Sequence, residues 1–270
     1  MTRPVLSYYS FLNLAKAVLF LLTDNTPSDY HGLCRHQMND CLLEVSAETN
    51  NGVFLDLADT LGGQIANRVC YTIEDFVLNT VELRDRYQDY FQREPVIIEP
   101  RIEVYLDGNI YITITPSSFL GRDRIGFIQL LSDRTSIFAD FEEESGTSDQ
   151  PEVRLKIRVP IPKGEINSIG SDLLAKHFMF SVFDSSSYYL NLSEQVKRVP
   201  PVAAYFGIMF LLSCIARYGP NHIDQFVNWK DTSVGWFFRE LCELAERVFP
   251  NILLNAMQKA NLKFAPSFSL

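Results

Sequence analysis

The sequence predicts an α+β fold, with a mainly α-helical body and a small inserted antiparallel β-sheet. Near both ends of the chain, apolar residues recur at three- and four-residue spacing, which is typical of helices that bury one side. Between them the pattern changes to alternation, which is typical of half-buried strands. We therefore expect an N-terminal helical part (1–94), an inserted sheet region (95–164) and a C-terminal helical part (165–270) that packs on the first.

Three helices are predicted before residue 94. Helical spacing covers Ser7–Leu22, Val53–Leu61 and Ile73–Phe91. The last begins with Thr72 and Asp75, which have the spacing of a capping box. The polar stretch between the first two helices is expected to be irregular, with weak strand potential at 41–45.

The C-terminal part is also predicted to be helical, with helices at 172–182, 202–217 and 233–249 and another beyond Pro250. The run 202–216 is almost wholly apolar, but a bilayer span needs about 20 residues, which is longer than this run. We therefore expect a buried central helix with Pro201 in its first turn, and no membrane contact.

The inserted region contains a clear hairpin. Apolar residues alternate along 102–106 and 110–114, and Asp107-Gly108 between them is a tight-turn pair. A further half-buried strand is expected at 153–159, and another at 126–131. The acidic stretch 140–150 is predicted to be a mobile loop because it has few residues to bury.

Composition narrows the functional classes. The net charge of −9 disfavours a broad nonspecific nucleic-acid surface, although a local basic groove stays open. The odd number of cysteines, 5 in 270 residues, is unlike a secreted disulfide framework. The N-terminus shows no separate apolar signal region, so we expect a cytoplasmic protein with reduced thiols. The commonest phosphate-loop, serine-hydrolase and zinc-protease motifs are absent from the sequence, and no cofactor is expected.

Four short segments carry a family resemblance: 7–17, 31–33 followed by 51–54, 213–220 and 249–255. Their residues and order resemble those of the YaaC-like family of bacterial proteins across nearly the whole chain. That resemblance implies no catalytic residues, because the family is essentially uncharacterised.

The first helix, with paired tyrosines and Ala15-Lys16-Ala17, is also similar to the opening helix of HEPN domains. Many HEPN domains cleave RNA without metal, using Arg and His separated by four to six residues, and Arg217 and His222 fit that spacing. His would accept the 2′-OH proton and Arg would hold the phosphate. The other interpretation is that Arg217 caps the carbonyls ending its helix, because Tyr218 departs from the HEPN pattern and Gly219-Pro220 would break the helix.

Two further residue sets are candidates for binding, one for an acidic partner and one for a metal ion. Arg154, Lys156 and Arg158 should share one face of their strand, either as a solvated face or as a binding site for an acidic partner. That partner would be the chain's own acidic residues at 142–144 or a nucleic-acid backbone. Four potential zinc ligands lie close in sequence, but they lack a paired-cysteine motif. We favour a polar loop with both cysteines facing inward; the four are His31, Cys34, His36 and Cys41.

The leading functional hypothesis is a helical component that binds other proteins, including further copies of itself, inside a bacterial anti-phage defence or stress-response assembly. The missing catalytic motifs and the acidic charge favour it. The alternative is a HEPN-like, metal-independent ribonuclease that uses Arg217 and His222, with RNA as its partner.

Overall fold

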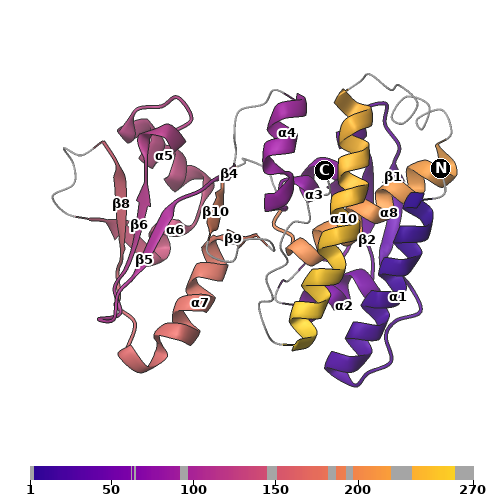
Figure 1. Cartoon of the computed structure of the whole chain (residues 1–270), viewed down its shortest axis with the longest axis horizontal. Helices are drawn as coiled ribbons and strands as arrows, with labels where there is room; N and C mark the ends of the chain where they lie inside the picture. Colours follow the sequence, from indigo (N-terminus) through magenta and orange to yellow (C-terminus); the bar gives the residue numbers. More distant parts are fainter. Residues whose placement is uncertain are drawn as a thin grey trace, which may run out of the picture. The chain divides into compact units, whose positions relative to one another are not determined.

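The structure is a computed structural model that describes residues 3–61, 63, 65–91, 97–144, 151–181, 187–192, 197–219 and 233–258. It divides into two compact units, which we call the helical unit (Met1–Arg93 with Val196–Leu270) and the sheet unit (Glu94–Gln195). The sheet unit is inserted along the chain between the two halves of the helical unit (Figure 1). The predicted fold class, a helical body with a small inserted antiparallel sheet, is therefore confirmed.

The sheet unit extends further along the chain than predicted. Its predicted C-terminal boundary was residue 164, whereas the unit continues to Gln195. Helix α7 (Ile166–His177) belongs to it, because Leu174 and Phe178 are buried in the same core as the strands. An amphipathic pattern shows that a helix has an apolar side but not which core that side meets, so the boundary was misplaced.

Helix α8 (Pro201–Tyr218) is the central element of the helical unit, as predicted. Every residue from Val202 to Ile215 is buried, and Pro201 lies in its first turn. Among the described residues of this unit, the helix packs against helices that come before and after it in the chain (Figure 1). They are α1 (Arg3–Thr23), α2 (Val53–Thr60), α3 (Ile73–Val77) and α10 (Ser233–Gln258).

The predicted helix at 73–91 is broken in the structure. Thr72 and Asp75 form the expected capping box, but α3 ends at Val77 and α4 (Arg84–Phe91) follows a single 3-10 turn. The Thr80 hydroxyl donates to the Val77 carbonyl, and the Asn79 amide to the Asp75 carbonyl. These side chains take over carbonyls that a continuing helix would have used, so the helix ends there.

Helix α10 shows the opposite departure. We predicted two helices separated at Pro250, but α10 runs from Ser233 to Gln258 with Pro250 inside it. Phe249 and Leu253 are buried on the two sides of the proline. Burying such side chains stabilises by about 1.5–3 kcal/mol each, which is enough to offset the roughly 3 kcal/mol cost of an internal proline.

A small antiparallel sheet in the helical unit was not predicted. Its strands are β1 (Leu33–Gln37), β2 (Ser46–Thr49) and β3 (Cys70–Thr72), in the order β1-β2-β3. The stretch 41–45, where we expected weak strand potential, instead contains a 3-10 turn at 42–44. β1 is exposed beyond its first residue, so it lacks the alternation of buried and exposed residues that predicts a strand. β3 is remote from the other two strands in sequence.

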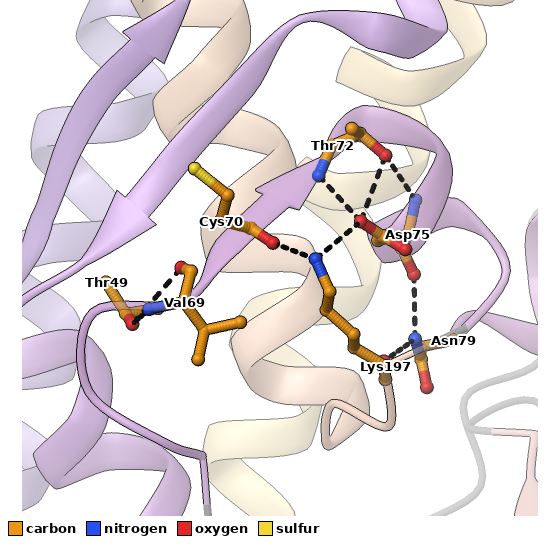
Figure 2. Close-up of polar contacts among 7 residues, drawn as sticks. All are labelled: Thr49, Val69, Cys70, Thr72, Asp75, Asn79 and Lys197. Carbon is orange, nitrogen blue, oxygen red and sulfur yellow. Dashed lines mark hydrogen bonds and ion pairs between the residues drawn. The ribbon is translucent and has the colours of Figure 1, made fainter. Parts of the chain in front are cut away.

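The chain re-enters the helical unit at a polar anchor (Figure 2). The buried Asn79 amide nitrogen donates to the Lys197 carbonyl at 2.9 Å, and its oxygen accepts from the Val199 N–H at 3.0 Å. The Lys197 ammonium donates to the Cys70 carbonyl and lies 4.0 Å from the Asp75 carboxylate. These contacts fix the segment that leads into α8.

The sheet unit is built on four antiparallel strands in the order β5-β6-β8-β7. The predicted hairpin is confirmed as β5 (Arg101–Val104) and β6 (Ile110–Ile114), with Gly108 at φ +86° in the turn. The predicted strand at 153–159 is β8 (Val153–Ile157), which pairs with β6. Alternate residues of β6 and β8 are buried and form one face of the core.

Helices cover that buried face. They are α5 (Arg124–Arg134), α6 (Ile137–Asp140) and α7, each of which adds apolar side chains to the same core. The strand predicted at 126–131 is wrong, because those residues lie in α5. The Asp123 carboxylate accepts from the Gly126 N–H and starts the helix. A short apolar run does not by itself distinguish strand from helix.

Two further predictions in this unit need correction. Residues 141–143 of the predicted loop form β7 (Phe141–Glu143), because Phe141 is fully buried and the strand pairs with β8; residues 145–150 lie outside the described part. The helix predicted at 172–182 is α7, which starts earlier and is followed by β9 (Met179–Phe180). β9 joins a second small sheet with β10 (Tyr188–Asn191) and β4 (Ile97–Ile98).

Candidate functional site

Helix α1 carries apolar side chains on its exposed side as well as its buried one. Its buried side, which includes Tyr8, Phe11 and Val18, faces the core. On the opposite side, Leu6, Tyr9, Phe20 and Leu21 are 65%, 47%, 53% and 60% exposed. Helical spacing places three more exposed residues on that side. We call this set the α1 outer face: Leu6, Tyr9, Ser10, Asn13, Ala17, Phe20 and Leu21.

The α1 outer face has no charged side chain. Surface helices of globular proteins normally carry charged and polar residues opposite the core. The charged residues of α1 are Lys16 and Arg3, and neither belongs to this set. Arg3 is the first residue of the helix and forms ion pairs with Glu243 and Glu246. This lack of charge is visible in the sequence and could have indicated the face. We predicted α1 only as a core-facing helix.

Two helices among the described residues are long and apolar enough to cross a membrane by length and composition. In α8, 78% of the tested window is buried inside the protein, as in the core helix of a globular protein. In α1, which lies near the N-terminus, 28% is buried. This test is weak evidence for a membrane, but it singles out α1 as an apolar helix that the described residues cover on one side.

A polar cluster lies beside the α1 outer face, at the last turn of α8. Arg217 Nε donates to the Ser213 carbonyl at 3.3 Å, and its Nη2 donates to the Ser213 hydroxyl at 3.2 Å. Its Nη1 donates to Tyr9 Oη at 3.2 Å. Arg217 therefore binds the carbonyl of Ser213, four residues earlier in its own helix, which lies before the free carbonyls at the helix end.

The exposed ring of Tyr218 lies close to two cations. The guanidinium carbons of Arg35 and Arg217 are each 5.1 Å from the Tyr218 ring centroid, within cation–π range. The ring is 58% exposed. Among the described residues, neither arginine has a carboxylate within ion-pair distance. We call Arg35, Tyr9, Arg217 and Tyr218 the arginine–tyrosine cluster.

His31 lies beneath this cluster as a neutral ring. Its Nδ1 accepts from the Leu33 N–H at 3.2 Å, and the ring packs against Tyr8 and Phe210. Burial, and then the charge of Arg217, lower the pKa of His31 below its ordinary value. Because Nδ1 is an acceptor, the ring proton is on Nε2. Tyr8 Oη is also buried here and has no hydrogen-bond partner among the described residues, and burial raises its pKa.

The structure does not test the proposed catalytic pair of Arg217 and His222. Arg217 has the position described above. His222, its predicted partner, lies outside the described residues.

The basic stripe on β8 faces the chain's own carboxylates. Arg154 Nε lies 3.2 Å from Glu144 Oε2, and Arg158 Nη1 lies 3.4 Å from Glu142 Oε2. Arg154 and Lys156 alternate with buried residues and share the outer face of the sheet, whereas Arg158 directly follows the strand. The acidic residues that were expected as one possible partner of the stripe are thus partners of its two arginines.

The four zinc-ligand candidates do not form one group. No set of three among them has its ligand atoms close enough for a shared ion. The expectation that both cysteines face inward is wrong, because Cys34 and Cys41 are exposed. Cys34 lies on β1, where every residue after Leu33 is exposed.

The described residues thus define an α+β protein with an apolar helix face beside an arginine–tyrosine cluster. The sequence model of the YaaC-like Protein family matches residues 1–257, and the chain belongs to that family. Neither a curated protein nor a solved structure matches the chain. Three of the segments that carry the resemblance, 7–17, 31–33 and 213–220, contribute Tyr9, His31 and Arg217 to the region just described.

Proposed function

We propose that the protein acts as a helical interaction component whose α1 outer face binds a second copy of the same chain. The observation that carries this proposal is the α1 outer face itself, which exposes Leu6, Tyr9, Phe20 and Leu21 and contains no charged residue. Solvent-exposed helix faces of this kind mark interaction sites. An uncharged face also has no charges that would repel an identical face.

The order of residues along the face favours an antiparallel pair of α1 helices. Large side chains lie at its two ends, at Leu6 and at Phe20 and Leu21, whereas Ser10 and Ala17 near the middle are small. In an interface with two-fold symmetry, residue i contacts residue j and j contacts i. With the axis near Asn13, each Leu6 meets the other helix's Leu21, and the small residues let the helices approach closely.

Sedimentation of the full chain tests this association. Burying a large apolar side chain contributes about 1.5–3 kcal/mol, and association itself costs several kcal/mol. We therefore expect a dimer that forms at roughly 1–100 μM. Leu6→Glu and Phe20→Glu should give monomers with unchanged thermal melts. Leu106→Glu, at a site in the sheet unit that is 88% exposed, is the matched control and should still dimerise.

Cross-linking tests the antiparallel geometry. In a background where Cys34 and Cys41 are serine, Asn13→Cys should form a disulfide between two copies, because it lies near the proposed axis. Leu21→Cys should cross-link only when mixed with Leu6→Cys. A wild-type chain that stays monomeric throughout this range, or one that instead binds lipid vesicles through α1, overturns the proposal.

The setting of this function is proposed from the HEPN resemblance, because HEPN domains are common in toxin and phage-defence systems. We propose a bacterial defence or stress-response assembly. Its test is a phage-challenge assay in cells carrying the wild type or Phe20→Glu. Loss of protection in that variant, at equal protein level, supports a role for the interaction in defence. Equal protection by the wild type and Phe20→Glu would show that defence does not require association through α1.

A second candidate function is binding and cleavage of single-stranded RNA at the arginine–tyrosine cluster. The observation that favours it is the exposed Tyr218 ring close to two arginines that lack carboxylate partners among the described residues. Aromatic rings stack on bases and arginines hold phosphates, as in proteins that bind single strands. Under this proposal Arg217 holds the scissile phosphate and His222 accepts the 2′-OH proton.

RNA binding and cleavage should be measured on the same variants. Tyr218→Ala should weaken binding of a labelled single-stranded RNA by about 1–3 kcal/mol, and Arg35→Ala should lower the salt dependence. Arg101→Ala, at an exposed arginine paired with Glu103 on the sheet unit, is the control. His222→Ala should bind RNA normally without cleaving it. Equal RNA affinity of Tyr218→Ala and the wild type would exclude this site.

A further inference from the structure

Three potential metal ligands meet on one face of the small sheet in the helical unit. His36 Nδ1, a Glu48 carboxylate oxygen and Cys70 Sγ all lie within 4.8 Å of one another. They come from three adjacent strands, β1, β2 and β3. In sequence, Cys70 is 34 residues from His36 (70 − 36), so only the pairing of the strands brings them together.

The strand register explains why these residues share a face. Glu48 is the Cα partner of Cys34 on β1 and of Cys70 on β3, so the three form one row across the sheet. Side chains at directly opposite positions point to the same face. The neighbouring row, with Ala47 and Tyr71, is buried and faces the core, so the row with Glu48 lies on the outer face.

His36 joins the row through an irregularity in β1. The register shifts between Arg35 and Gln37, so His36 has no partner of its own in β2. Such bulges re-aim a side chain. Here the ring is directed toward Glu48, with His36 Nδ1 at 3.9 Å from Glu48 Oε2.

The separations suit a tetrahedral ion. Zinc binds Cys, His and carboxylate ligands at about 2.0–2.3 Å, which places neighbouring ligand atoms roughly 3.3–3.8 Å apart in a tetrahedron. The observed 3.9 Å between His36 and Glu48 is close to that value. The remaining adjustment is a side-chain rotation, because His36 is exposed and the other two are partly exposed.

The surroundings leave the Cys70 thiol available. Figure 2 shows its sulfur pointing away from Lys197, whose ammonium donates instead to the Cys70 carbonyl. Asp75 is engaged by the capping box and by Lys197 on that same side. The Lys197 ammonium is thus paired with backbone and carboxylate oxygens, and the Cys70 sulfur faces Glu48 and His36.

We propose that His36, Glu48 and Cys70 form a zinc-binding site, with Cys34 as the fourth ligand. A set with thiolate, imidazole and carboxylate donors favours Zn²⁺ over Mg²⁺ or Ca²⁺, which prefer oxygen ligands. Cys34 is exposed and lies directly opposite Glu48 in the strand register, although its sulfur is not among the ligand atoms that lie within 4.8 Å of one another. Under this proposal its side chain rotates toward the ion on binding. This site is independent of the α1 outer face.

Bound zinc would fasten the three strands together. β3 contributes three residues and β2 four, and β3 is separated from β2 by a long connection. An ion bound by all three strands holds the two ends of that connection together. It stabilises the folded state by RT ln(1 + [Zn]/Kd). Because a thiol binds zinc as the thiolate, zinc binding should release a proton and weaken at lower pH.

Zinc titration of the full chain tests the site. The metal-stripped protein is titrated with Zn²⁺ in competition with a chromophoric chelator and, separately, with Co²⁺. We expect one ion to bind each chain, with the visible bands of tetrahedral cobalt and a thiolate charge-transfer band. Cys70→Ser and His36→Ala should each weaken Zn²⁺ binding at least about tenfold. Glu48→Gln should weaken binding in the same direction.

Cys41→Ser is the matched control, because Cys41 is an exposed cysteine close in sequence but outside the cluster. It should bind zinc like the wild type, and thermal melts of the zinc-free variants should match that of the zinc-free wild type. Failure of the wild type to compete with the chelator, or equal affinity in Cys70→Ser, His36→Ala and Cys41→Ser, overturns the site. Unchanged affinity in Cys34→Ser overturns the four-ligand form.

Discussion

Arg217 donates a hydrogen bond from Nη1 to Tyr9 Oη, at 3.2 Å, and so joins the last turn of α8 to the outer face of α1. Through its other nitrogens the same guanidinium binds the carbonyl and hydroxyl of Ser213. One side chain therefore connects the central helix, the proposed docking face and the arginine–tyrosine cluster.

The first prediction concerns this contact. Tyr9→Phe should lower the free energy of unfolding by about 0.5–1.5 kcal/mol, the net value of one hydrogen bond. Arg217→Ala should cost more, because it also removes the bonds to Ser213. A double-mutant cycle measured by denaturant unfolding should give a coupling of similar size to the Tyr9→Phe loss. Simple additivity of the two losses would contradict the contact.

The second prediction concerns the close approach of α8 and α3. A Cβ at Gly207 would collide with the ring of Phe76, which is fully buried. Gly207→Ala should therefore destabilise the protein by about 1–3 kcal/mol, although alanine is the better helix former by about 1 kcal/mol. Adding Phe76→Leu should recover part of the loss in thermal melts. A more stable Gly207→Ala variant would show that the helices can separate there.

The third prediction is a pH dependence of stability from His31. Its pKa is lowered in the folded protein, so the unfolded chain binds more protons below its ordinary pKa of about 6.5. The stability that depends on neutral His31 is therefore complete above that pH and falls as the pH drops below it, by at most about 1.4 kcal/mol per pH unit. Denaturant unfolding at several pH values measures this slope.

The control is His31→Asn, whose side-chain oxygen can still accept from the N–H two residues on. This variant should lose the contribution of His31 to the slope and keep the bond to Leu33. The slope of the wild type should therefore be steeper. Equal slopes would mean that His31 titrates alike in the folded and unfolded chains.

The fourth prediction concerns the anchor that leads into α8. Asn79→Ala removes two donated bonds and one accepted bond, and it leaves the Val199 N–H buried without its partner. We expect a loss of at least about 1–3 kcal/mol. Asn67→Ala removes exposed hydrogen bonds to the Asn51 side chain and from the Arg68 N–H in the same unit, and it should change stability by less than about 0.5 kcal/mol. Equal losses in the two variants would contradict a buried anchor.

Part of the candidate sites could be predicted from the sequence. Arg217 was identified in both of its possible roles, because its position at the end of an apolar run is a local feature. The α1 outer face was not, since the apolar residues of a helix do not show which of them the core covers. The sequence indicated His36 and Cys34 as possible ligands and placed Cys41 close to them along the chain. In the folded sheet, their neighbours are instead Glu48 and Cys70.

The sequence by itself determined the elements whose pattern is local. The hairpin at Asp107-Gly108, the capping box at Thr72 and the buried helix after Pro200 each follow from spacings of a few residues, because backbone periodicity and turn geometry act over that range. Only the tertiary structure decided which core α7 joins, that α10 continues through Pro250, and that Cys70 lies beside Glu48. These outcomes depend on contacts between residues distant in the chain, where burial and strand pairing outweigh local preference.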